Sequence, residues 1–162
     1  MKVAILTISD KGSKGERVDE SGKILQEIME KNGAEIVSYQ IIPDEKRLIA
    51  KDLRILADYE KVDLVLTTGG TGLSPRDVTP EATISVIDKE VPGFAEAMRA
   101  ESLKITPNAM LSRAVSGMRG RTLIINLPGS PKAAKECLEV VLPAIPHGIK
   151  ILRGEGGECA VK

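Results

Sequence analysis

Residues 63–72 read DLVLTTGGTG, and this segment is the most informative one for the fold. Its first half, residues 63–67, is expected to form a strand. Its second half, residues 67–72, places three glycines and interleaved threonines directly after that strand. We therefore expect a strand that leads directly into a glycine-rich turn.

Apolar and amphipathic segments alternate on both sides of this stretch. Further strands are expected at residues 3–8, 36–42 and 122–127. Helices are expected at residues 19–32, 45–58 and 93–103, and from 131 onward with a break near Pro143 and Pro146. A shorter helix should start at Pro80, with Thr79 as its cap. This alternation predicts a three-layer α/β/α, Rossmann-like fold: a mostly parallel sheet with helices on both faces.

Length and composition exclude several classes of protein. The 162 residues show no linker or repeat, so we expect a single domain over residues 1–162. Lys and Arg total 23, as do Asp and Glu, which leaves no basic surplus for a nucleic acid. No segment approaches the roughly 20 apolar residues of a membrane span, and no signal-peptide pattern follows the first strand. We expect a cytoplasmic protein that binds neither nucleic acid nor membrane.

The glycine turn is predicted to bind phosphate. Gly69, Gly70 and Gly72 lack side chains that would keep an anion away from the backbone. Main-chain N–H groups and the hydroxyls of Thr68 and Thr71 can then hold phosphate oxygens. The run is neither a Walker A loop nor a Rossmann dinucleotide fingerprint, because the spacing of both differs. A plain strand-to-helix turn is the alternative, but it explains only one or two of the glycines.

Two carboxylates are predicted to lie beside this turn. Asp44 follows the strand at 36–42 and Asp77 follows the glycine run, so both should reach the rim where parallel strands end. Mg²⁺ takes one or two carboxylates and completes its coordination with phosphate oxygens and water. We therefore predict that Asp44 and Asp77 hold Mg²⁺. The alternatives are a helix cap for Asp44 and a turn or cap residue for Asp77.

Three other loops carry polar residues that suit the same rim. Ser9 and Asp10 follow the first strand. The segment Pro128-Gly129-Ser130 leads into a helix whose free N–H groups attract anions, with an ordinary Ser cap as the alternative. Arg113, beside Ser112, can bind a phosphate bidentately or can lie at a solvated helix end.

The few nucleophilic or metal-binding residues do not form a motif. His147 is the single histidine, which excludes His-based triads and His-rich metal sites. Cys137 is expected in the core, and Cys159 has no His or Cys partner for zinc. We therefore expect chemistry that rests on positioning and charge.

Residues 67–72 together with residues 76–83, RDVTPEAT, resemble the signature of the MogA/MoaB family of molybdenum cofactor biosynthesis. The resemblance covers nearly the whole chain, because four further segments match: Ser9-Asp10, Pro43-Asp44-Glu45, Leu111-Ser112-Arg113 and Leu127-Pro128-Gly129. It implies a homotrimer that binds molybdopterin, a pterin monophosphate bearing a dithiolene. Active members use Mg²⁺ and ATP to adenylylate molybdopterin with release of pyrophosphate, and the product is handed over to a molybdenum-insertion protein.

The resemblance also implies roles for individual residues. Asp44 and Asp77 match the essential carboxylates of the family. The nucleotide would be held by Thr68, Gly69, Gly70, Thr71 and Gly72. The pterin side would be lined by Ser9, Asp10, Ser112, Arg113, Pro128, Gly129 and Ser130. Two alternatives stay open: a MoaB-type protein that binds molybdopterin without adenylyl transfer, and a tubulin-like nucleotide-binding protein.

Overall fold

The computed structural model describes residues 1–155, so Cys159 lies outside the described part of the chain. Its six-stranded sheet has the strand order β2-β1-β3-β6-β5-β4. The strands are β1 (Lys2–Ile8), β2 (Glu35–Ile42), β3 (Leu64–Thr68), β4 (Lys89–Glu90), β5 (Ser116–Arg119) and β6 (Thr122–Leu127). Strands β2, β1, β3 and β6 run parallel, which confirms the predicted, mostly parallel sheet.

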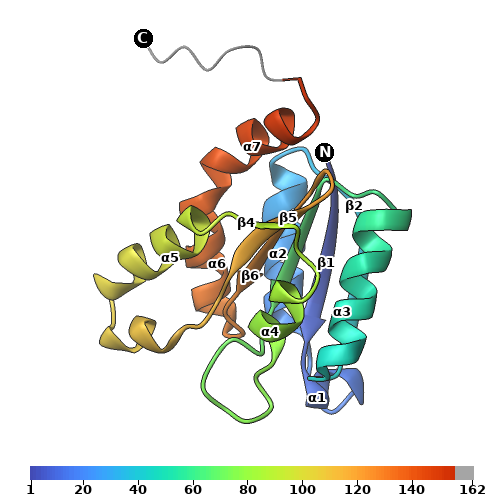
Figure 1. Ribbon diagram of the computed structural model, residues 1–162. Coiled ribbons are helices and arrows are strands. Elements are labelled where there is room, and N and C mark those ends of the chain that lie inside the picture. The colour runs from blue at the N-terminus through green and yellow to red at the C-terminus, as the bar shows by residue number, and fades with distance from the viewer. Residues whose placement is uncertain (156–162) are drawn as a thin grey trace.

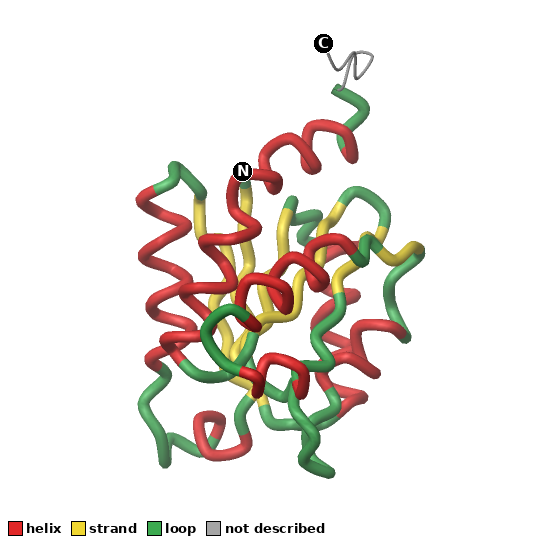
Figure 2. Tube along the Cα trace, turned by 90° about the vertical axis from the view of Figure 1, so that its left-hand side faces the viewer, coloured by secondary structure: helices red, strands yellow, loops and turns green. Residues whose placement is uncertain are grey.

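Helices cover both faces of this sheet (Figures 1 and 2). The α-helices are α1 (Asp10–Ser13), α2 (Glu20–Lys31), α3 (Lys46–Arg54), α4 (Thr79–Ile84), α5 (Gly93–Leu103), α6 (Pro131–Val141) and α7 (Ile145–Leu152). Tighter or wider helical turns are η1 (Ile55–Tyr59), η2 (Pro107–Leu111) and η3 (Leu142–Ala144). The predicted break near Pro143 is confirmed, because η3 separates α6 from α7 where proline has no N–H to donate.

Two apolar clusters, one on each face, hold the three layers together. Alternate residues of a strand point to opposite faces. On one face Ile5 belongs to a cluster with Leu25 of α2 and the buried Cys137 of α6. On the other face Leu6 belongs to a cluster with Ile49 of α3. Within residues 1–155, none of the helices has the length and apolarity needed to cross a bilayer.

The structure departs from the sequence-based expectation at β4 and β5. Strand β5 pairs antiparallel with β6 through a two-residue turn at Gly120 and Arg121, where Gly120 has φ +55°. Strand β4 then pairs antiparallel with β5 at the sheet edge. Both strands are short and lack an apolar alternation, so their existence depends on pairing with β6 rather than on local pattern.

The predicted Thr79 cap is wrong. Val78 occupies the N-cap position of α4 without a side-chain cap, and Thr79 is the first residue of the helix. The buried Thr79 hydroxyl instead donates to the Gly69 carbonyl at 2.9 Å. The residue therefore fastens the start of α4 to the glycine turn.

Candidate active site

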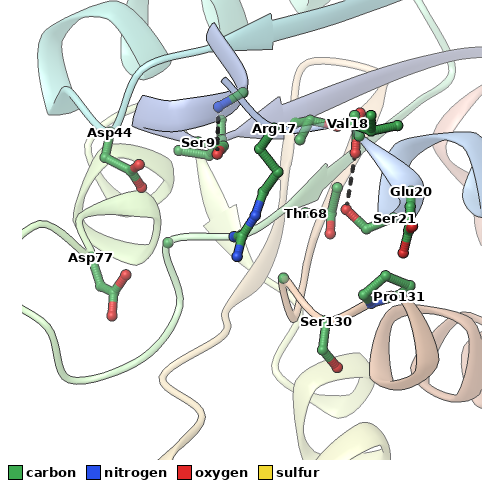
Figure 3. A pocket seen from close by; sticks show the side chains of 17 residues that line it. Ser9, Arg17, Val18, Glu20, Ser21, Asp44, Thr68, Asp77, Ser130 and Pro131 are labelled. Carbon is green, nitrogen blue, oxygen red and sulfur yellow. Dashed lines mark hydrogen bonds between the residues drawn. The ribbon is translucent and has the colours of Figure 1, made fainter. Parts of the chain in front are cut away.

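A cavity of about 630 Å³ opens beyond the carboxyl ends of the parallel strands (Figure 3). This position follows from the topology, because β1, β3 and β6 are neighbours that end at the same edge. The residues that line the cavity are 7–9, 12, 17–21, 44, 68–70, 77 and 129–131. Four loops far apart in the sequence thus meet at one site.

The glycine turn forms the floor of this cavity and requires glycine at two positions. Gly69 has φ +100°, and a Cβ there would lie 2.3 Å from the carbonyl oxygen of Ile8. Gly70 has φ +63°, and a Cβ there would lie 2.4 Å from the Thr79 hydroxyl. The Gly70 N–H donates to no acceptor among residues 1–155. A backbone donor therefore faces a place that an anion can approach closely.

Thr68 ties the end of β3 to the end of β6. Its hydroxyl donates to the Pro128 carbonyl at 2.8 Å, and the N–H of Gly69 donates to the Leu127 carbonyl at 3.2 Å. The hydroxyl proton of Thr68 is therefore already donated to a protein carbonyl rather than to a ligand. Neither Thr71 nor Gly72 lines the cavity, unlike the expectation for the whole run.

Asp44 and Asp77 both line the cavity, and Figure 3 shows them on the same side of it. A Cβ at Gly70 would lie 3.0 Å from Asp44 Oδ1, and one at Gly72 would lie 2.9 Å from Asp77 Oδ2. Burial, together with the nearby carboxylates of Asp10 and Asp77, raises the pKa of Asp44. The site therefore concentrates negative charge where a cation would relieve it.

Of the alternative roles considered for the two aspartates, the helix cap for Asp44 is wrong and the turn residue for Asp77 is confirmed. The N-cap of α3 is Glu45, without a side-chain cap, so Asp44 is not the helix cap. Its Oδ2 instead accepts the Asp10 N–H at 2.8 Å. Asp77 does stabilise a turn, since its Oδ2 accepts the Ser74 N–H at 2.9 Å while the residue also lines the cavity.

The carboxylates of the cavity suit Mg²⁺, which takes part of its coordination from water and phosphate, better than a metal whose ligands all come from the protein. Residues 1–155 contain no cluster of three or more His, Cys, Asp or Glu side chains suited to a metal. Two carboxylates with hard oxygen donors are what a Mg²⁺ ion uses when phosphates and water supply its other ligands. Asp44 and Asp77 provide such a pair.

Asp10 lies outside the cavity and holds loops together. Its carboxylate accepts two hydrogen bonds from Arg76, at 3.0 and 2.9 Å, and one from the Asp44 N–H at 3.1 Å. The hydrogen bond from Arg76 keeps the pKa of Asp10 below its ordinary value. Ser9 does line the cavity, and its Oγ caps α1 by accepting the Gly12 N–H at 3.0 Å.

The structure places Arg113 behind the glycine turn rather than in the cavity. Its guanidinium donates to the carbonyls of Gly72 and Asp77, at 2.7 and 2.6 Å, and pairs with Glu81. These contacts use the side chain to fix the loop that carries Asp77. Ser112 and Pro128 instead line a separate, mostly apolar cavity of about 210 Å³ beside α5 and α6.

The start of α6 contributes the opposite wall of the cavity. Gly129, Ser130 and Pro131 all line it. Ser130 is the N-cap of α6, and its Oγ accepts the Ala133 N–H at 3.2 Å, which confirms the ordinary Ser cap. Because this positive helix end also faces the cavity, the cap and an anion-binding role are compatible.

Residues 17–21 line the cavity but were missed by sequence reasoning. Asp19 caps α2 and is buried, and its carboxylate accepts hydrogen bonds from Thr7 Oγ1 at 2.6 Å, the Gly22 N–H at 2.9 Å, Ser21 Oγ and the Tyr39 hydroxyl. Burial alone would raise the pKa of Asp19, but these hydrogen bonds outweigh it and lower the pKa. The start of α2 at Asp19 was visible in the sequence; the contacts with β1 and β2 were not.

Fold and cavity define a class: a three-layer α/β protein with an acidic, glycine-floored ligand site at the carboxyl edge of its sheet. Residues 4–147 match the family model described as a probable molybdopterin binding domain. The molybdopterin adenylyltransferase of Helicobacter pylori strain J99 is 49% identical over 155 residues, covering 94% of this chain and 88% of that protein. The enzyme of the same name from Escherichia coli K12 is 43% identical, covering 92% and 80%.

A solved structure shows the same similarity in three dimensions. The molybdopterin biosynthesis enzyme MoaB of Thermus thermophilus superposes with a TM-score of 0.90 at 54% identity, covering 94% of this chain and 96% of that one. The chain therefore belongs to the molybdopterin-binding domain family, in the MogA/MoaB group of molybdenum cofactor biosynthesis proteins.

Proposed function

We propose that the protein is a molybdopterin adenylyltransferase, which transfers the AMP group of ATP to the phosphate of molybdopterin. The observation that carries this proposal is the placement of Asp44 and Asp77 next to a glycine turn in one cavity. Binding a pterin alone does not require two carboxylates beside a phosphate site. The names of the Helicobacter pylori and Escherichia coli relatives support the same activity.

The reaction needs no nucleophile from the protein. An oxygen of the pterin phosphate attacks the α-phosphorus of ATP, the bond from that phosphorus to the bridging oxygen breaks, and pyrophosphate leaves. The residues that line the cavity include no histidine, cysteine or lysine within the described part of the chain. Positioning of two phosphates and neutralisation of their charge are the tasks that such a lining can perform.

The two walls of the cavity divide these tasks. Asp44 and Asp77 would hold Mg²⁺, which when bound neutralises charge on the ATP phosphates and on the departing pyrophosphate. The free Gly70 N–H would donate to a phosphate oxygen of the nucleotide. The N-terminus of α6 at Ser130 would receive the second anion, the pterin phosphate. The product would then pass to a molybdenum-insertion protein.

Pyrophosphate release tests this function. With ATP, Mg²⁺ and molybdopterin, the wild-type protein should release pyrophosphate, and Asp44→Asn or Asp77→Asn should slow release on the order of 100-fold while pterin binding survives. Asp58→Asn is the matched control, because Asp58 pairs with Arg119 outside the cavity. That variant should keep the wild-type rate.

Two outcomes would contradict the proposal. Wild-type rates in both cavity variants would remove the role of the carboxylates. Pterin binding by the wild-type protein without any release of pyrophosphate would identify a MoaB-type binding protein instead.

A further inference from the structure

Arg17 reaches into the cavity from the loop between α1 and α2. Figure 3 shows its side chain extending between Asp44 and Asp77 on one side and Ser130 on the other. The guanidinium makes no hydrogen bond or ion pair with any residue of the described chain. An arginine has five N–H donors, so its full hydrogen-bonding capacity is available to a ligand.

The charges around Arg17 make this position unusual. Among the described residues that line the cavity, Arg17 is the single cation, and four carboxylates accompany it: Asp19, Glu20, Asp44 and Asp77. Asp19 is occupied by four hydrogen bonds from its own surroundings. Even so, Arg17 pairs with none of the four. A guanidinium that leaves neighbouring carboxylates unpaired is available to an anionic ligand.

The loop that carries Arg17 is anchored at both ends. Before it, the N–H of Gly15 donates to the Gly12 carbonyl at 3.0 Å, and the N–H of Glu16 donates to the Lys11 carbonyl at 2.9 Å. After it, the buried Asp19 fixes the start of α2. Only residues 17 and 18 lie between these anchors, so the backbone at Arg17 is held next to the cavity that its side chain lines.

We propose that Arg17 binds the α-phosphate of the nucleotide, the group that is transferred, and so positions it between the two walls of the cavity. The proposal rests on the adenylyltransferase function above and adds to it the cation that meets the reacting phosphate. Bidentate donation by a guanidinium suits two phosphate oxygens. It would also offset the negative charge that accumulates there when the pterin phosphate approaches.

Nucleotide affinity in the absence of molybdopterin tests this role separately from catalysis. Isothermal titration with AMP and with Mg²⁺-ATP should show that Arg17→Ala weakens both by roughly tenfold or more, because a charge-assisted hydrogen bond is lost. Arg17→Lys should recover part of the affinity, since it keeps the charge but not the planar fork. Lys14→Ala is the matched control: Lys14 is exposed on the same loop and outside the cavity, so the affinity of that variant should stay within about twofold of wild type.

Several results of the titrations would overturn the proposal. Unchanged affinity in Arg17→Ala would show that Arg17 is a solvated loop residue. An equal loss in Lys14→Ala would show that both residues act only through the general positive charge of the loop. If Arg17→Ala lost affinity for ATP but not for AMP, the contact would be with a phosphate other than the α-phosphate. If the wild-type protein bound no nucleotide, the proposal would be wrong. If the wild-type protein binds nucleotide, Arg17→Ala binds it about tenfold more weakly, and the wild-type protein still releases no pyrophosphate, then only the proposed function is contradicted.

Discussion

Gly70 is the residue at which backbone conformation and the site are most tightly coupled. Its positive φ of +63° is a conformation that L-residues adopt at a cost. The space for a Cβ is already taken by the Thr79 hydroxyl at 2.4 Å and by Asp44 Oδ1 at 3.0 Å. The same lack of a side chain that permits the turn also leaves its N–H accessible.

We expect Gly70→Ala to lower the free energy of unfolding by about 3 kcal/mol, from left-handed strain plus overpacking. Gly33→Ala is the control, because Gly33 has φ +76° and a methyl group there would meet nothing within 4 Å. That variant should lose about 1 kcal/mol, from backbone strain alone. Urea unfolding at one protein concentration measures both, and equal losses would show that crowding at Gly70 is relieved without cost.

At the scale of elements, buried Asp19 joins three of them. Its carboxylate caps α2 while it accepts hydrogen bonds from Thr7 of β1 and from Tyr39 of β2. Burial and the bond to Asp19 raise the pKa of Tyr39, so its hydroxyl stays a donor. The wall of the cavity formed by residues 17–21 therefore depends on one ionised carboxylate.

Acid should weaken this junction. The folded-state pKa of Asp19 lies below its unfolded value near 3.9, so the unfolded chain binds more protons around that pH. The stabilisation is complete above the unfolded pKa and is lost as the pH falls through the folded one. We expect Asp19→Asn to cost about 2 kcal/mol at pH 7 and to flatten the decline of unfolding free energy below pH 4.

Tyr39→Phe removes one donor and keeps the ring, so it separates this junction from the other carboxylates of the protein. Its acid decline should be smaller than that of the wild type and should end at a higher pH, because the folded pKa of Asp19 is less depressed while its unfolded pKa is the same. Denaturant titrations from pH 7 to 2.5 measure all three proteins. Parallel curves for wild type and Asp19→Asn would show that Asp19 does not contribute to acid sensitivity.

At the scale of the whole molecule, several large apolar side chains are exposed on the surface of the described part of the protein. Four of them lie in α5, η2 and the turn between these elements: Leu103, Ile105, Met110 and Leu111. Apolar side chains gathered on a surface often mark a contact with another chain. We therefore predict that the homotrimer expected from the sequence resemblance forms through this part of the surface.

We predict a sedimentation-equilibrium mass of three times the 17.4 kDa chain. Met110→Glu should shift the mass toward that of one chain, because Met110 is 67% exposed in this segment and a charge buried in an interface is costly. Leu48→Glu, exposed on α3 across the sheet, should leave the mass unchanged. A wild-type protein with the mass of one chain at micromolar concentration would contradict the prediction.

Much of the candidate site was predictable because its signals are local. The glycine run and both aspartates follow predicted strands, and the ends of parallel strands meet at one edge. The role of Arg113 was harder to predict. An arginine that binds phosphate and one that holds the phosphate loop through its carbonyls can stand in the same local sequence. Arg17 and Asp19 had no motif, because they reach the site only through the path of the loop between α1 and α2.

The alternation of strands and helices, the glycine turn and the strand ends that bear Asp44 and Asp77 follow from local sequence, because periodicity, backbone conformation and chain position are local properties. The sheet order, the antiparallel strands β5 and β4, and the set of polar side chains that face the cavity depend on the three-dimensional fold. They could not be read locally, because strand pairing and side-chain direction depend on contacts between segments that are far apart in the chain.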